Sequence, residues 1–77
     1  MQAASSRLAQ AARIVRGIER NGLAVGVVLD AWGNLEAVDK DSPRFAALLG
    51  SASVSSRVVG VFGPGVTVAQ LLAEAGA

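Results

Sequence analysis

Leu23-Ala24-Val25-Gly26-Val27-Val28-Leu29 is the stretch that decides the fold of this 77-residue chain. It is a continuous apolar run with several β-branched residues, bounded by Gly22 before it and Asp30 after it. A short apolar run between such boundaries is typical of a strand that is buried on both faces. We therefore expect Leu23 to Leu29 to form the central strand of a sheet.

The residues that follow predict a hairpin. Gly33 and Asn34 tolerate positive φ, so Ala31 to Asn34 suits a tight connection, and a second short run, Leu35 to Val38, comes directly after it. Apolar and polar residues separate only weakly between the two faces of this second run, which favours an edge strand. A third strand is expected over Arg57 to Phe62, which contains three valines.

Three further segments carry helix signals. The first helix should be amphipathic and end at Asn21-Gly22, and the last has a capping box formed by Thr67 and Gln70. The predicted ranges are Ser5 or Ser6 to Arg20, Pro43 to Leu49 behind a Ser42 cap, and Val68 to Ala75. Residues 1 to 4 and the small-residue segment Ser51 to Ser56 are expected to be flexible.

The element order is therefore helix, strand, strand, helix, strand, helix, in a single α+β domain that spans residues 1–77. A right-handed crossover from the second strand would place the third strand parallel to it, on the far side of the first. The predicted strand order is 2-1-3, with helices packed on the sheet. Such a sheet has two open edges, and an open edge is a template for another chain.

The composition argues against the common kinds of catalysis. The chain is 52% hydrophobic and 17% charged, and it has no His, Cys or Tyr. Without His, the serines lack the usual activating base, and structural zinc or disulfides are not expected. We therefore expect a protein that is not an enzyme and that uses no cofactor, metal or small-molecule substrate.

The apolar surplus instead favours a protein partner. A domain of this size buries only roughly 60% of the surface of its unfolded chain, so apolar side chains remain outside. The leading hypothesis is a structural or assembly subunit that self-associates or docks in a larger particle. A bacterial or phage assembly, such as a virion, is one example. The predicted contact residues are Trp32, Ile14, Ile18, Leu71 and Leu72. The alternative is that much of the surplus is ordinary core.

A basic stripe on the first helix supports an alternative hypothesis. Arg13, Arg16 and Arg20 fall close together at about 100° per residue, and guanidinium groups bind phosphates and carboxylates. This face suits nucleic acid or an acidic protein surface, although a solvated helix face has the same pattern. A second possible anion site is the helix start at Gly65 and Thr67, where the lysine of a phosphate-binding loop is missing.

The remaining polar features are weaker signals. Asp30, Glu36, Asp39 and Asp41 cluster around the hairpin, but turn polarity explains them better than a calcium loop. The formal charge of +1 gives no strong field toward nucleic acid or a membrane. No export signal or apolar span is visible, so we expect a soluble protein of the cytoplasm or of an assembled particle.

Overall fold

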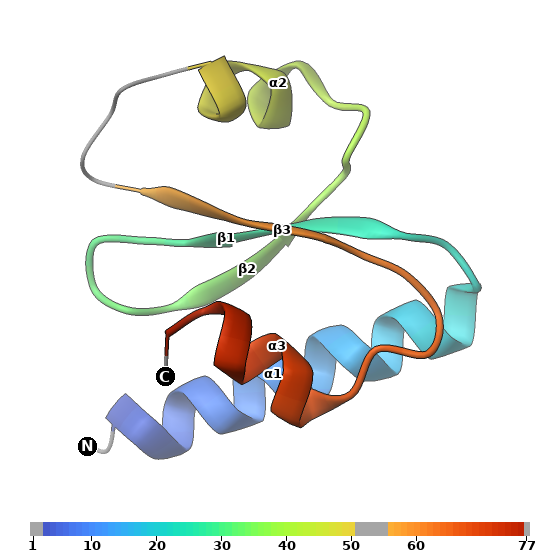
Figure 1. The fold of residues 1–77 in the computed structure, drawn as a ribbon, viewed down its shortest axis with the longest axis vertical. Helices are drawn as coiled ribbons and strands as arrows, with labels where there is room; N and C mark the ends of the chain where they lie inside the picture. The colour runs from blue at the N-terminus through green and yellow to red at the C-terminus, as the bar shows by residue number, and fades with distance from the viewer. Residues whose placement is uncertain (1–2, 51–55, 77) are drawn as a thin grey trace.

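A computed structural model describes residues 3–50 and 56–76 of the chain. The predicted element order and the α+β class are confirmed. The elements are α1 (Ala3–Asn21), β1 (Val25–Leu29), β2 (Leu35–Val38), α2 (Pro43–Gly50), β3 (Arg57–Phe62) and α3 (Val68–Glu74) (Figure 1).

The three strands form one sheet in the predicted order β2-β1-β3. β1 pairs antiparallel with both neighbours, so β2 and β3 run parallel to each other on opposite sides of it. In the hairpin, Gly26 lies opposite Val38 and Leu29 lies opposite Leu35. The expectation that β1 is central and that β2 is an edge strand is therefore confirmed.

The β1·β3 ladder contains a bulge. Val27 pairs with Gly60 and Val28 pairs with Val58, so Val59 has no partner position on β1. An extra residue of this kind bends its strand and disturbs the regular spacing of backbone groups along the edge. The two open edges of the sheet therefore differ: the β2 edge is regular and the β3 edge is bulged.

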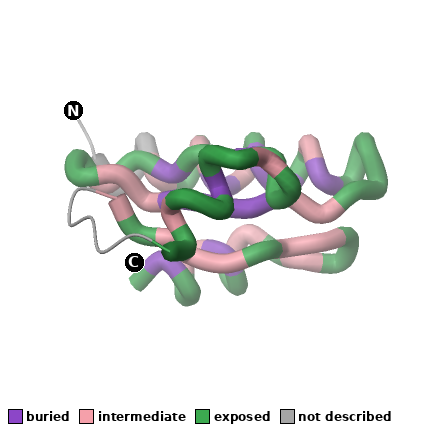
Figure 2. Tube along the Cα trace, turned by 90° about the horizontal axis from the view of Figure 1, so that it is seen from above, coloured by how far each residue is buried: buried purple, intermediate pink, exposed green. Residues whose placement is uncertain are grey.

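α1 and α3 cover one face of the sheet (Figure 1). The apolar side of α1 contacts α3 and the residues of β1 and β2 that face it. The buried members of this cluster are Ala11, Ile14, Val15, Ile18, Val27, Leu35, Leu71 and Ala75. Buried positions (purple) form short stretches between exposed ones along the trace (Figure 2), as expected for elements with one buried side.

α2 covers the opposite face, where Phe45 packs against Val28 and Val38. Ser42 Oγ accepts a hydrogen bond from the Phe45 backbone N–H over 3.1 Å, which confirms the predicted helix cap. The aromatic ring lies over Gly26, where any Cβ would overlap its atoms. A glycine in the central strand therefore makes room for the only buried side chain of α2.

Two predicted boundaries were wrong. β1 begins at Val25 rather than at Leu23, because Gly22 turns the chain with φ +69° and leaves Leu23 67% exposed before the strand starts. α1 begins at Ala3, ahead of the predicted cap at Ser5 or Ser6, so residues 3 and 4 belong to the helix, while residues 1 and 2 lie outside the described residues. Residues 51–55 of the predicted linker lie outside the described residues.

Candidate interaction site

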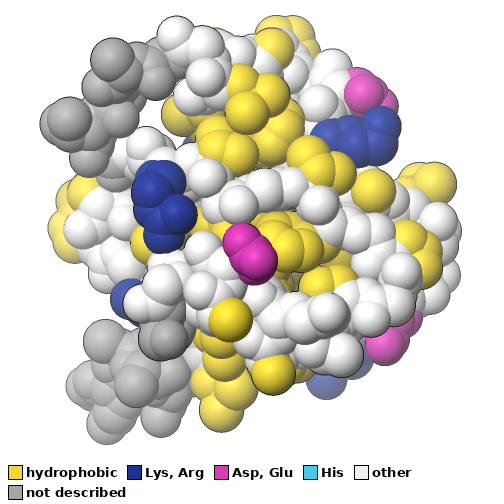
Figure 3. Space-filling view, viewed as in Figure 1, with side chains coloured by type: hydrophobic (Ala, Val, Ile, Leu, Met, Phe, Trp, Pro, Cys, Tyr) yellow, Lys and Arg dark blue, Asp and Glu magenta, His cyan; other side chains and the backbone are white. Residues whose placement is uncertain are grey.

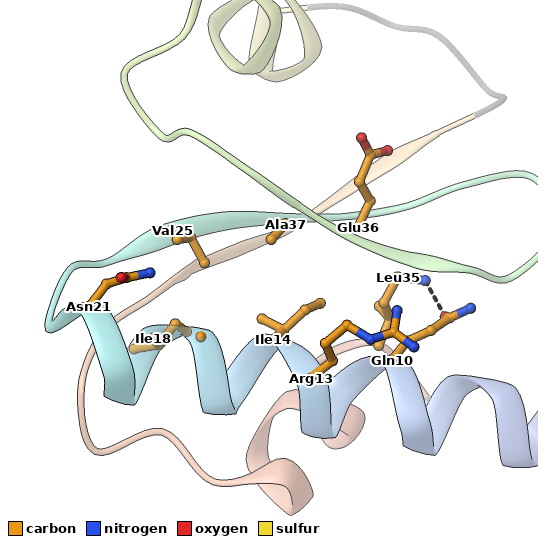
Figure 4. Close-up of a pocket in the computed structure, with 10 residues that line it drawn as sticks. Gln10, Arg13, Ile14, Ile18, Asn21, Val25, Leu35, Glu36 and Ala37 are labelled. Atoms are coloured by element: carbon orange, nitrogen blue, oxygen red, sulfur yellow. Dashed lines mark hydrogen bonds between the residues drawn. The ribbon is translucent and has the colours of Figure 1, made fainter.

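A groove of about 370 Å³ runs between α1 and β2. Ile14 and Ile18 of α1 and Ala37 of β2 contribute to its apolar floor. In Figure 4 the two isoleucines lie below Val25 and Ala37, while Arg13 stands on the α1 side of the groove. Glu36 points away from α1 in the same view. The groove therefore has an apolar floor and a cationic side chain on its helix wall.

The backbone of β2 borders this groove with an incompletely used edge. The Asp30 N–H donates to the Asn34 carbonyl oxygen over 3.0 Å, and the Leu35 N–H instead donates to Gln10 Oε1 over 2.7 Å. Backbone groups of an antiparallel edge strand alternate between the partner strand and the open side. The N–H and C=O of Ala37 therefore face away from β1, beside the groove. Among the outward N–H groups of β2, α1 accepts a hydrogen bond only from that of Leu35 in the described part of the chain.

Gly17 lines the groove from the middle of α1. A Cβ built on this residue would meet no atom within 4 Å, so packing inside the chain does not require glycine here. Glycine in a helix interior costs roughly 0.5–1 kcal/mol relative to alanine. The sequence shows that this glycine lowers the helix propensity of α1, but only the structure shows that its missing side chain leaves space in the groove.

The charges around the groove are unevenly distributed. Arg13, Arg16 and Arg20 are exposed on α1, and the ion pairs among residues 3–50 and 56–76 involve none of them. Glu36 is already paired, because Arg44 donates to both of its carboxylate oxygens over 2.6 and 3.1 Å. These bonds lower the pKa of Glu36 and raise the pKa of Arg44. The helix wall of the groove is therefore positive, and the carboxylate of Glu36, which also lines the groove, points away from α1 and is held by Arg44.

The hairpin beside the groove is tied down by hydrogen bonds. The backbone N–H groups of Trp32 and Asn34 both donate to Asp30 Oδ1 over 2.9 Å. These bonds, with the Asn34 N–H the strongest, lower the pKa of Asp30. From α1, Arg7 Nε donates to the Gly33 carbonyl over 3.1 Å. The Trp32 side chain remains 83% exposed at this rigid tip.

The predicted contact residues separate into two groups. Trp32 is exposed, as a contact residue must be, and Leu72 is half-buried. Ile14, Ile18 and Leu71 belong to the core between α1, α3 and the sheet. The sequence does place these side chains on the apolar faces of α1 and α3, but both faces pack against each other and against the sheet. Ile14 and Ile18 also line the floor of the groove between α1 and β2.

The predicted anion site at Gly65 and Thr67 uses its polar groups internally. Thr67 Oγ1 accepts from the Gln70 N–H over 3.1 Å, and Gln70 Oε1 accepts from the Thr67 N–H over 2.9 Å. The predicted capping box is therefore confirmed, and it occupies two of the backbone donors at the start of α3, those of Thr67 and Gln70. Among the described residues, no cluster of three or more Asp, Glu, His or Cys side chains has the geometry of a metal site.

Apolar side chains also gather on the face that Figure 3 shows, over the middle of the molecule between α2 above and α3 below. Val61 of β3 and Leu49 of α2 are among the exposed large hydrophobic residues. Few charged side chains interrupt this surface (Figure 3). Unlike the groove, it offers no charge pattern that indicates what would cover it.

No protein-family model matches the chain, and comparisons with curated proteins and with solved structures found no significant match. None of the helices in the described part of the chain is both long and apolar enough to cross a membrane.

Proposed function

We propose that this chain is a non-enzymatic interaction subunit that binds an extended segment of another protein along the free edge of β2. The observation that carries this proposal is the position of the outward Ala37 backbone groups beside the apolar groove between α1 and β2. Strand addition to a sheet edge combines backbone hydrogen bonds with pockets for alternate side chains. Gly17 supports the proposal, because its missing side chain leaves space that no part of the chain fills.

The β2 edge suits an added strand better than the β3 edge does. The extra residue Val59 disturbs the spacing of backbone groups on β3, and bulges are a common protection of sheet edges against pairing. β2 keeps a regular register with β1 over all four of its residues. A partner strand would therefore find regularly spaced backbone groups at β2, namely the outward Leu35 carbonyl and the outward N–H and C=O of Ala37, whereas the Leu35 N–H is already taken by Gln10.

The charge on α1 favours a different protein over a second copy as the partner. A two-fold axis beside β2 would bring α1 of one copy next to α1 of the other, since α1 lies under this edge. Arg13, Arg16 and Arg20 would then approach the same three cations of the second copy. Like charges that face each other across an interface oppose binding.

The first test is a selection of displayed random peptides on the full chain. We expect enriched peptides to lose at least about tenfold in affinity when Gly17→Leu fills the groove, because the added side chain occupies the ligand space. Ala69→Leu is the matched control, since it introduces the same side chain at an exposed position of α3. Peptides that bind the Gly17→Leu variant as tightly as the natural chain would overturn the proposed site.

The second test is the mass of the protein in solution, measured by light scattering over a range of concentrations. A partner-binding subunit with a cationic edge should remain a monomer without its ligand. A concentration-dependent dimer that Gly17→Leu or a charge change at Arg13 disrupts would instead assign the β2 edge to self-association, which is the other form of the interaction hypothesis.

A further inference from the structure

We infer that the segment bound at the β2 edge is acidic on its α1-facing side, with carboxylates that pair with Arg13 and Arg20 and an apolar residue between them. This inference rests on the proposed function, because it names the chemistry of the partner at the same groove. It adds a statement that strand addition alone does not make, namely that the ligand is selected by charge on one of its two faces.

The helix geometry selects two of the three arginines. At about 100° per residue, Arg13 and Arg20 lie about 40° and 60° around the helix from Gly17, whereas Arg16 lies about 100° away. Arg13 is itself part of the groove wall. Arg13 and Arg20 therefore lie on the same side of Gly17 and close together around the helix, and Arg16 lies farther toward the outer side of the helix.

The spacing of Arg13 and Arg20 along the helix fits a strand. They are seven positions apart, a rise of about 10.5 Å along α1. Residues i and i+4 of a strand point to the same face and lie about 13 Å apart. Long arginine side chains span the difference. Two acidic residues four positions apart would thus meet Arg13 and Arg20, and the residue midway between them would face the floor formed by Ile14 and Ile18.

On the opposite face of the added strand, a carboxylate would not strengthen binding. That face would lie beside Glu36, which is on the α2 side of the sheet and holds both of its oxygens on Arg44. A further acid there would meet a like charge without a free cation. The preferred ligand therefore alternates, with acidic and apolar residues on one face and neutral residues on the other.

A nucleic acid is the competing source of anionic groups. Three arginines and a net charge of +1 are a small electrostatic footprint, and the groove floor is aliphatic, without an aromatic side chain on which a base could stack. The free strand edge beside the arginines matches a polypeptide backbone, which both donates and accepts hydrogen bonds. A sugar-phosphate backbone cannot extend the β2 ladder.

The test uses the full chain and capped peptides of the sequence Thr-Glu-Thr-Val-Thr-Glu-Thr, with Gln or Lys in place of both Glu residues. We expect the Glu peptide to bind about tenfold more tightly than the Gln peptide, measured by amide shifts in NMR titration, and the Lys peptide to bind least. Added salt should reduce the preference for Glu. A single-stranded DNA oligonucleotide should not displace the Glu peptide.

Single variants locate the selectivity. Arg13→Gln and Arg20→Gln should each reduce the preference for Glu over Gln severalfold, while Arg16→Gln, which makes the same change on the same helix, should leave it nearly unchanged. Equal binding of the Glu and Gln peptides, with both lost in Gly17→Leu, would overturn the acidic ligand but keep the groove. Absence of binding by the Glu peptide, or its displacement by DNA, would also overturn the inference. The selection of displayed peptides would then test independently whether the groove binds a peptide at all.

Discussion

Gly26 shows how a single residue decides the packing of an element. The Phe45 ring occupies the space in which a Cβ at this position would lie. We expect Gly26→Ala to destabilise the protein by roughly 1–3 kcal/mol, because the ring or the strand must move. Urea denaturation measures this change. Gly17→Ala is the matched control and should stabilise by roughly 0.5–1 kcal/mol, since its Cβ enters open space on a helix. Similar destabilisation by both variants would contradict this explanation.

Asp30 makes the stability of the hairpin depend on pH. Its pKa is lowered in the folded chain by the Asn34 and Trp32 N–H groups, so the unfolded chain binds a proton more readily than the folded chain does. The stabilising contribution is therefore complete above the unfolded pKa, near 3.9, and is lost as the pH falls through the lower folded pKa. Asp30→Asn, which keeps an acceptor oxygen but cannot titrate, should flatten the fall of the urea midpoint below about pH 4. An unchanged slope would show that other carboxylates are responsible.

Residue patterns in the sequence predicted the caps at Ser42 and Thr67, the hairpin with Trp32 at its tip and the central position of β1. They did not predict which apolar helix residues would face a partner. Ile14 and Leu71 have the same pattern whether they pack on their own sheet or on another protein. Only the placement of α1 against β2 shows that the core absorbs them and leaves an open groove at Gly17.

At the scale of elements, α3 depends on its cap. A helix of seven residues is too short to be stable in isolation. The Thr67–Gln70 capping box gives hydrogen-bond partners to the backbone N–H groups of Thr67 and Gln70, which would otherwise be unpaired. Thr67→Ala should destabilise the protein by about 1 kcal/mol in urea or thermal denaturation. Thr67→Ser keeps the hydroxyl and should lose much less. If the two variants were equally destabilised, the methyl group rather than the cap would be the important feature.

The strand order was predictable for two reasons. β1 is the most apolar segment, which favours the central position. The hairpin places β2 on one side of β1, and the connection through α2 then brings β3 to the other side. The difference between the two edges was not predictable. The bulge at Val59 depends on how Gly60 and Val58 pair with β1, and β3 reaches β1 through a long connection rather than through a tight turn that would fix the register. The choice between the β2 and β3 edges as a binding site therefore needed the structure.

At the scale of the whole molecule, helices pack on both faces of the sheet, and we propose that a partner binds at one of the sheet edges. α1 and α3 cover one face and α2 contributes Phe45 to the other (Figure 1). Much of the apolar excess in the sequence is thus ordinary core. The interaction that we propose uses a smaller surface, the groove with its arginines and the backbone of one short strand.

Hydrogen exchange at the Ala37 amide tests this account most directly. Because this N–H faces away from β1, it should exchange rapidly in the free protein. At a Glu-peptide concentration of 100 times the Kd, exchange should slow by a factor of about 100, as expected if it occurs only from the unbound state. The Val38 amide, which bonds to β1, should change much less. Peptide binding that leaves Ala37 exchange unchanged would contradict strand addition at β2.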